Sequence, residues 1–200
     1  MRHTATMVVP SRWPCPIDDI LIWSYAFDDG DDVLEHAHEA LADEGLADEV
    51  EADWGQLSDW ADAPQPGSPR WAEWALGRGA VRQAAAAVGL TDVRVERSPE
   101  GAPVIADSVW GVSIAHTSGL VLGAVGPGRI GVDVERANRD VKRLVRALLP
   151  SERELTVSLS AISILVAKEA AAKATGQGLG GCRSLYYLSL IHISEPTRPY

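Results

Sequence analysis

Two acidic residues in the second half of the chain have a spacing that suits a metal ion. Asp133 and Glu135 are two residues apart, next to an apolar run at 130–134 that predicts a strand. Residues two apart on a strand point to the same face, so both carboxylates can bind one hard cation. A pair of exposed acids at a strand end has the same pattern, and the spacing alone leaves both interpretations open.

A second charged group lies on a helix predicted over 162–175. Glu169 and Lys173 are four residues apart and share one helix face, and Lys168 lies beside them. Taken alone, this pattern is typical of a solvent-facing ion pair worth about 0.3–0.5 kcal/mol. Glu169 could also add a third carboxylate to Asp133 and Glu135. Two lysines near a bound Mg²⁺ would then supply the charge compensation that a diphosphate needs.

A histidine and two hydroxyl groups follow one another at the end of a predicted strand. His116, Thr117 and Ser118 precede Gly119, and together they are a compact set of candidate phosphate donors. A single histidine at a strand end also serves structural roles. Because side chains alternate along a strand, His116 shares its face with Ile114, which could be the face that packs on the core.

The elements that must position these residues are strands and helices in mixed order. A β-branched and aromatic run predicts a strand over 20–27, and Ser68 with Pro69 predicts the start of a helix that continues to about Val88. The helix over 162–175 is predicted to end at Gly176. Short apolar runs predict strands of an antiparallel sheet at 93–95, 112–115, 121–125 and 130–134. Strands followed by helices in each half predict an α+β fold.

Composition and charge exclude several classes of protein. The chain has 200 residues, 46% of them hydrophobic, and a net charge of −10, which disfavours nucleic acid as a partner. The acids concentrate in the first half, where the stretch 28–53 predicts a helix with a charged outer face, so the second half is the expected anion binder. No apolar stretch predicts a membrane span or a signal peptide, and a cytoplasmic protein is expected. The two cysteines, Cys15 and Cys182, do not predict a disulfide framework.

Glycine-rich motifs for nucleotide binding or hydrolysis do not fit their context. Gly126–Gly131 matches G-x-G-x-x-G, but a predicted strand follows it where a phosphate-binding helix would have to begin. We therefore interpret it as a hairpin turn. The chain contains no Walker loop and no G-x-S-x-G elbow, so the sequence does not indicate a P-loop enzyme or a serine hydrolase.

Four motifs in a fixed order resemble the 4′-phosphopantetheinyl transferase superfamily in its larger, pseudo-dimeric form. They lie at 101–103 (Gly-Ala-Pro), 112–117 (Val-Ser-Ile-Ala-His-Thr), 131–135 (Gly-Val-Asp-Val-Glu) and 168–179. The G-R-x-x-x-R pattern that includes Arg78 and Arg82 is similar to a helix of the family's N-terminal half that contributes to coenzyme A binding. The resemblance implies two similar α+β halves that form a pseudo-dimer, each with a small antiparallel sheet packed on helices.

The resemblance also implies an activity and a role for each candidate residue. The chain would transfer the 4′-phosphopantetheine arm of coenzyme A to a serine of an acyl or peptidyl carrier protein and release adenosine 3′,5′-bisphosphate. Mg²⁺ would be held by three carboxylates, those of Asp133, Glu135 and Glu169. The other roles are contact with the 3′-phosphate (His116, Thr117), an additional nucleotide contact (Arg78), a position facing the phosphates (Lys168, Lys173), acceptance of the serine proton (Glu169) and stabilisation of the leaving group (Lys173).

Three positions depart from the family pattern. Ala102 stands where Lys or Arg is frequent, Ala115 where Ser is common, and Leu165 where Trp is usual. The first two changes weaken the expected 3′-phosphate pocket, because each removes a donor.

The resemblance divides the chain into two halves and a tail. Residues 1–105 are expected to form the N-terminal half, and residues 106–187 a C-terminal half that carries the metal and catalytic motifs but lacks its closing strands. Residues 188–200 resemble an in-frame translation of an adaptor used in sequencing libraries, so we expect a non-native tail there. An intact chain of this form is expected to be monomeric.

Two other functions remain open at the level of sequence. A non-catalytic remnant would bind coenzyme A or a carrier protein without turnover, and another metal-dependent phosphotransferase or pyrophosphatase would use the same acids without a carrier. The residues do not indicate whether a carrier would serve fatty-acid, polyketide or nonribosomal-peptide synthesis.

Overall fold

A computed structural model describes residues 11–13, 15, 19–26, 64, 68–140, 142, 145, 148–157 and 159–177. They form an α+β structure with antiparallel strands, as the order of elements predicted. The helix predicted within 28–53, the segment after 177 and Cys182 lie outside the described residues. No helix of the described part is both long and apolar enough to cross a membrane.

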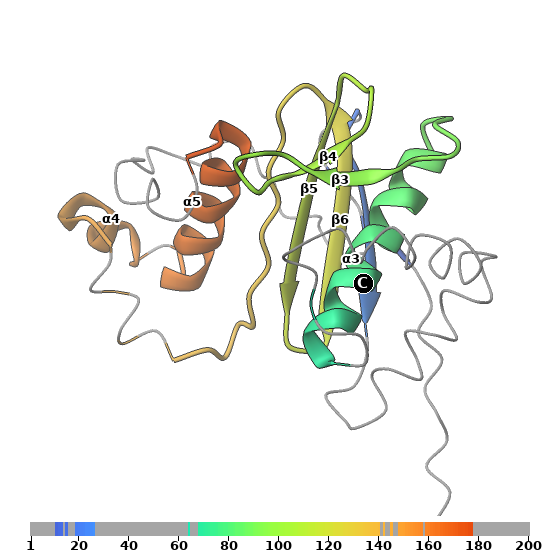
Figure 1. Cartoon of the computed structure of the whole chain (residues 1–200). Coiled ribbons are helices and arrows are strands. Elements are labelled where there is room, and N and C mark those ends of the chain that lie inside the picture. The colour runs from blue at the N-terminus through green and yellow to red at the C-terminus, as the bar shows by residue number, and fades with distance from the viewer. Residues whose placement is uncertain are drawn as a thin grey trace, which may run out of the picture.

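The larger sheet has four antiparallel strands in the order β1-β2-β6-β5 (Figure 1). The bounds are Ser11–Trp13 for β1, Leu21–Ala26 for β2, Trp110–Thr117 for β5 and Leu120–Pro127 for β6. Strands β5 and β6 form a hairpin around Gly119, and β2 pairs with β6 along its whole length, from Leu21 opposite Val125 to Ala26 opposite Leu120. One sheet therefore contains strands from both sides of the division expected at residue 105.

Helix α3 (Pro69–Ala86) covers one face of this sheet. Ser68 caps it as predicted, since its Oγ accepts a hydrogen bond from the Trp71 amide at 3.1 Å. The helix approaches the sheet closely at Gly123, where an added Cβ would lie 2.5 Å from the backbone nitrogen of Val81. This close approach fixes the position of α3 over the middle of β6.

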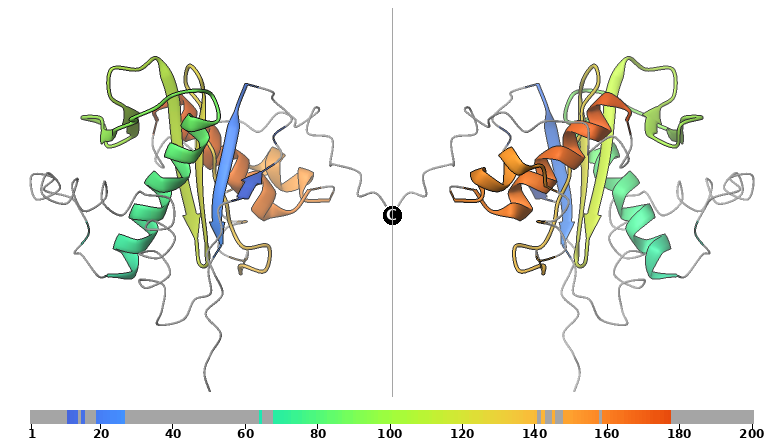
Figure 2. Two further views of the ribbon diagram at one scale, coloured as in Figure 1. Left: turned by 90° about the vertical axis from the view of Figure 1, so that its right-hand side faces the viewer. Right: turned by 90° about the vertical axis from the view of Figure 1, so that its left-hand side faces the viewer.

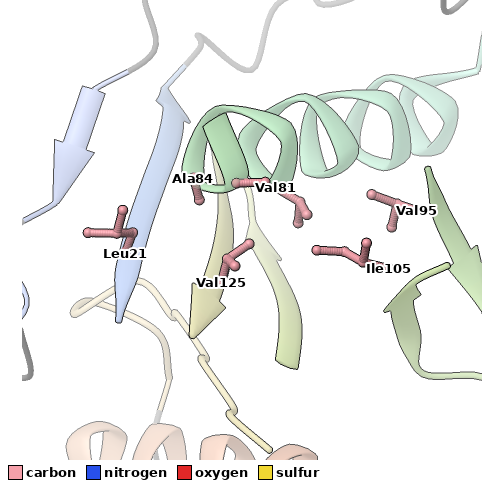
Figure 3. Close-up of a cluster of buried hydrophobic side chains, with 7 residues drawn as sticks. Leu21, Val81, Ala84, Val95, Ile105 and Val125 are labelled. Atoms are coloured by element: carbon pink, nitrogen blue, oxygen red, sulfur yellow. The ribbon is translucent and has the colours of Figure 1, made fainter. Parts of the chain in front are cut away.

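The main core lies between α3, the sheet and a small hairpin. Strands β3 (Val95–Arg97) and β4 (Pro103–Ile105) form that hairpin. Figure 3 shows buried side chains from α3, β2, β6 and the hairpin gathered in one cluster: Leu21, Val81, Ala84, Val95, Ile105 and Val125. Burying a valine or leucine side chain completely contributes about 1.5–3 kcal/mol, so this cluster holds the hairpin against the sheet.

Two helices lie on the other side of the sheet from α3 (Figures 1 and 2). They are α4 (Pro150–Leu155) and α5 (Ala161–Thr175). Ser160 caps the start of α5, and Gly176 ends the helix with a φ of 71°, in the left-handed conformation that the sequence predicted. Helix α5 carries Lys168, Glu169 and Lys173, so its position decides where these candidates lie.

The prediction of a strand over 130–134 is wrong, because these residues form no strand in the structure. They run as irregular chain between β5 and α5, and their polar backbone groups bond to side chains. The Val132 amide donates to Ser113 Oγ at 3.0 Å, and the Val132 carbonyl accepts from Lys173 Nζ at 2.9 Å. These side-chain partners take the place of a neighbouring strand, and they fix the backbone next to Asp133.

Candidate functional site

The end of strand β5 presents two adjacent candidate residues to opposite sides of the sheet. On the α3 side, His116 Nδ1 lies 3.3 Å from Glu73 Oε2. On the α5 side, Thr117 Oγ1 donates to Glu135 Oε1 at 3.0 Å. The alternation of the strand therefore separates the two side chains. His116 does share its face with Ile114, but the imidazole is exposed and lines a pocket.

The pocket beside His116 has a volume of about 620 Å³, within the range of small-molecule sites. It lies between the first half of α3, the β3–β4 hairpin and β5. Its lining is rich in charge and includes one indole; the residues are Pro64, Arg70, Glu73, Trp74, Arg78, Glu96, Arg97, Gly101, Pro103, Ile114 and His116. Among the predicted contacts to a nucleotide, Arg78 and His116 thus meet in one pocket.

Arg78 is held in place by Trp74, one turn earlier on α3. Its guanidinium carbon lies 3.5 Å from the centroid of the Trp74 ring, and NH1 donates to the Trp74 carbonyl at 3.4 Å. Stacking on an indole face is a favourable arrangement for a guanidinium. The pair gives the α3 wall of the pocket a planar aromatic surface and a positive charge.

The second candidate group lies between β5 and α5 and contains Asp133, Glu169 and Lys173. Lys173 Nζ donates to Asp133 Oδ1 at 2.9 Å, to the Val132 carbonyl at 2.9 Å and to the Ile114 carbonyl at 3.3 Å. An ammonium group has three donors, and these bonds use all of them. In this structure Lys173 joins α5 to β5 and orients the Asp133 carboxylate.

Glu169 lies next to Asp133, and its surroundings favour the protonated carboxyl. Burial is the largest cause that raises the pKa of Glu169, and the negative charge of Asp133 and a hydrogen bond with that side chain add to it. The charges of Lys173 and Arg139 act in the opposite direction. Two neighbouring carboxyl groups of this kind can share a proton, or they can be neutralised together by a cation.

Glu135 is occupied by other partners. Its Oε1 accepts hydrogen bonds from Thr117 Oγ1 and from the Arg136 amide at 2.9 Å, and its Oε2 forms an ion pair with Arg139. Within the described residues, no three His, Cys, Asp or Glu side chains are gathered as a metal site. By the chemistry of their oxygens, Asp133 and Glu169 fit a hard cation such as Mg²⁺, whereas the Glu135 carboxylate is bound by Thr117, the Arg136 amide and Arg139.

Lys168 is placed apart from the other candidates. Its side chain is only 4% exposed and its Nζ contacts both oxygens of the fully buried Glu152, at 2.8 and 2.9 Å. Glu152 Oε2 also accepts the Leu149 amide at 2.8 Å, at the start of α4. The structure thus uses Lys168 to join α4 to α5, and it does not bring this ammonium to Asp133 or to the pocket.

Several residues of the site escaped sequence reasoning. Glu73, Trp74 and Arg97 line the pocket, and Arg139 pairs with Glu135. The spacing of Glu73, Trp74 and Arg78 within one helix could have placed them near a common face. Nothing in the sequence indicated that the hairpin carrying Arg97 would lie opposite that face.

One segment of the chain matches a known protein family. Residues 63–126, which include α3, the β3–β4 hairpin, β5 and most of β6, match the family model of the 4′-phosphopantetheinyl transferase N-terminal domain. No curated protein matches the chain significantly. The matched segment contains all the lining residues of the pocket, and this part of the chain is similar to the N-terminal domain of 4′-phosphopantetheinyl transferases.

Proposed function

We propose that the protein transfers the 4′-phosphopantetheine arm of coenzyme A to a serine of an acyl or peptidyl carrier protein. The observation that carries this proposal is the end of β5, where His116 opens to a basic pocket and Thr117 contacts the carboxylate group on the other side. A substrate with a nucleotide at one end and a pyrophosphate in the middle needs two such places next to each other. The pseudo-dimer of two α+β halves is part of the same proposal, with β2 contributing to the sheet across the division near residue 105.

The pocket is suited to the nucleotide end of coenzyme A. Trp74 offers an aromatic face, and Arg78 and His116 offer donors for phosphate oxygens. Thr117 is the next residue of β5, and its hydroxyl lies on the carboxylate side, where it donates to Glu135. The pyrophosphate would then cross the end of β5 toward α5.

Asp133 and Glu169 would hold Mg²⁺, and Glu135 would join them when it is released from Arg139. When bound, the cation would supply positive charge to the pyrophosphate oxygens. Lys173 would keep Asp133 in position through its hydrogen bond. Lys168 has no part in this proposal, because Glu152 holds its ammonium inside the protein.

The chemical step requires a proton acceptor for the serine hydroxyl of the carrier. Glu169 would accept this proton, since it is the carboxyl group that lies beside Asp133 at the proposed cation site. The serine oxygen would form a bond to the β-phosphorus while the bond between that phosphorus and the bridging oxygen breaks. The proton passes to Glu169, and adenosine 3′,5′-bisphosphate leaves with the bridging oxygen.

The proposal is tested by the mass of an apo carrier protein incubated with this chain, coenzyme A and Mg²⁺. We expect a gain of one phosphopantetheine group. Glu169→Gln keeps the size of the side chain but removes the base, and should lower the rate by about 10²–10³, as for loss of one preorganised catalytic group. The matched control is Glu154→Gln, a substitution of an exposed acid on α4 that should leave the rate unchanged.

Each other result of this assay points to a different function. Coenzyme A binding without any gain in carrier mass would support the non-catalytic remnant. Release of adenosine 3′,5′-bisphosphate from coenzyme A without a carrier would support a pyrophosphatase. A full rate in Glu169→Gln would exclude the proposed base.

A further inference from the structure

A buried ion pair joins the two helices on the α5 side of the sheet (Figure 1). The Glu152 side chain is fully buried, and both of its carboxylate oxygens accept from Lys168 Nζ, at 2.8 and 2.9 Å. Taking two charges out of water is unfavourable, and only close and well-oriented hydrogen bonds compensate for it. Because such bonds depend on direction as well as distance, the pair specifies how α5 is turned toward α4.

The Glu152 carboxylate is itself held in place before it meets its partner on α5. Helix α4 has six residues, too few to be stable alone. Glu152 accepts the Leu149 amide at 2.8 Å and so closes the first turn of the helix. Leu148, just before α4, packs with Ala161 and Ile164 of α5 in a buried apolar cluster. Glu152 is therefore a fixed acceptor on the wall that α5 faces.

The half of α5 that carries Glu169 has short side chains. Four of the five residues at 170–174 are alanines, which offer only a methyl group to interlock with their neighbours. The buried members of the apolar cluster on α5 belong to the first turn of the helix. The rotation of the second half about the helix axis is therefore set in large part by two lysines, Lys168 toward α4 and Lys173 toward β5.

A close contact at Gly131 makes the position of α5 matter for Asp133. A Cβ added at Gly131 would collide with the Ala170 carbonyl oxygen and lie 2.7 Å from the Ala174 nitrogen, so the two backbones are in direct contact. Asp133 follows two residues after Gly131, and Glu169 directly precedes Ala170. With no side chain at Gly131 to absorb a movement, turning or shifting α5 changes the separation of the two carboxylates.

We infer that Glu152 is a positioning residue for the carboxylate group, because through Lys168 it fixes the rotation of α5 that keeps Glu169 beside Asp133. Lys168 and Glu169 are successive residues, so their side chains leave the helix axis about 100° apart and cannot turn independently. The consequence for the rate rests on the proposed function, in which Asp133 and Glu169 bind Mg²⁺ and Glu169 accepts the serine proton.

A double variant separates positioning from stability. Glu152→Gln with Lys168→Met removes both charges, keeps side chains of similar length and leaves an oxygen at residue 152 to accept the Leu149 amide. Removing both members of a buried pair avoids the large loss that follows when one charge is left buried alone. We expect the double variant to remain folded, with a urea midpoint closer to that of the unaltered protein than the midpoint of Glu152→Gln alone.

The contact at Gly131 reports the position of α5 without metal or substrate. In the presence of a chelator, nuclear Overhauser effects should connect the Gly131 α-protons to the Ala174 amide proton in the unaltered protein. The double variant should lose these cross-peaks, because α5 is then free to turn. The corresponding contact between Gly123 and the Val81 amide on the α3 side is the internal reference and should persist.

Transfer kinetics give the second measurement. With coenzyme A, Mg²⁺ and an apo carrier, the double variant should lower kcat by about 10- to 100-fold, as for a group that orients a metal ligand. The KM for coenzyme A should stay within about twofold, because the nucleotide pocket lies on the other side of the sheet. The matched control, Glu154→Gln with Lys142→Met, removes one exposed acid and one exposed lysine and should change neither constant.

Three results would overturn the inference: retained Gly131 cross-peaks in the double variant, an unchanged kcat, or loss of the contacts at both Gly131 and Gly123, which would indicate general unfolding. An unaltered protein that transfers no phosphopantetheine has a different meaning. Together with selective loss of the Gly131 cross-peaks in the double variant, it would support positioning by Glu152 and overturn the transfer reaction alone.

Discussion

At the scale of single residues, Glu169 contributes to the pH dependence of stability through its position beside Asp133. Burial and the Asp133 charge raise the pKa of Glu169 above its ordinary value of 4.5 in the folded state. The folded state then binds more protons than the unfolded state as the pH rises from this value, so the free energy of unfolding falls with pH there. In the presence of a metal chelator, the free energy of unfolding of Glu169→Gln should fall less between pH 4.5 and neutrality than that of the unaltered protein. Urea unfolding at several pH values measures this difference. An identical fall in both proteins would contradict this cause.

The ion pair between Arg139 and Glu135 gives a second prediction at this scale. A cation that binds Glu135 must displace the guanidinium from Oε2. Arg139→Gln should therefore increase the affinity for Mg²⁺, by up to about fivefold for an exposed ion pair worth about 0–1 kcal/mol. Arg136→Gln is the control. This substitution removes the same charge, but the guanidinium of Arg136 donates to the Ser118 carbonyl. Calorimetry with Mg²⁺ measures both, and equal or reduced affinity in Arg139→Gln would exclude the competition.

At the scale of elements, local signals in the sequence predicted the helix ends well. Ser68 with Pro69 starts α3, and Gly176 ends α5, because caps depend on a few neighbouring residues. The prediction of a strand over 130–134 was wrong because it depends on residues that are distant in the sequence. Its apolar pattern suits a strand, but Ser113 and Lys173, distant in sequence, take the hydrogen bonds that a neighbouring strand would need.

The same distinction applies to the candidate site. The pattern of charges identified Asp133, Glu169 and Lys173, and the structure brings these side chains together. The pattern also grouped Lys168 with them, because it is next to Glu169. Successive residues of a helix point in different directions, and the partner of Lys168, Glu152, belongs to a helix whose position no local signal predicts.

At the scale of the whole molecule, the sheet separates the two parts of the proposed site. The pocket lies on the side of α3, which is packed closely on β6, and the carboxylates lie on the side of α5. Lys173 joins helix α5 to β5 and to the chain after β6, because its Nζ donates to the carbonyls of Ile114 and Val132. Both parts have to keep their relative position for a pyrophosphate to reach across the end of β5.

Hydrogen exchange can measure how far this connection depends on Lys173. Lys173→Met keeps most of the apolar stem but removes three hydrogen bonds, so α5 should open more easily while α3, held by the core, should not. For a loss of about 1.5–3 kcal/mol, the amides of α5 should exchange about 10- to 100-fold faster. Lys142→Met, a change of an exposed lysine, should leave both helices unaffected. Equal acceleration in α3 and α5 would mean that the molecule opens as one unit, and the two parts of the site would then be coupled through the whole sheet.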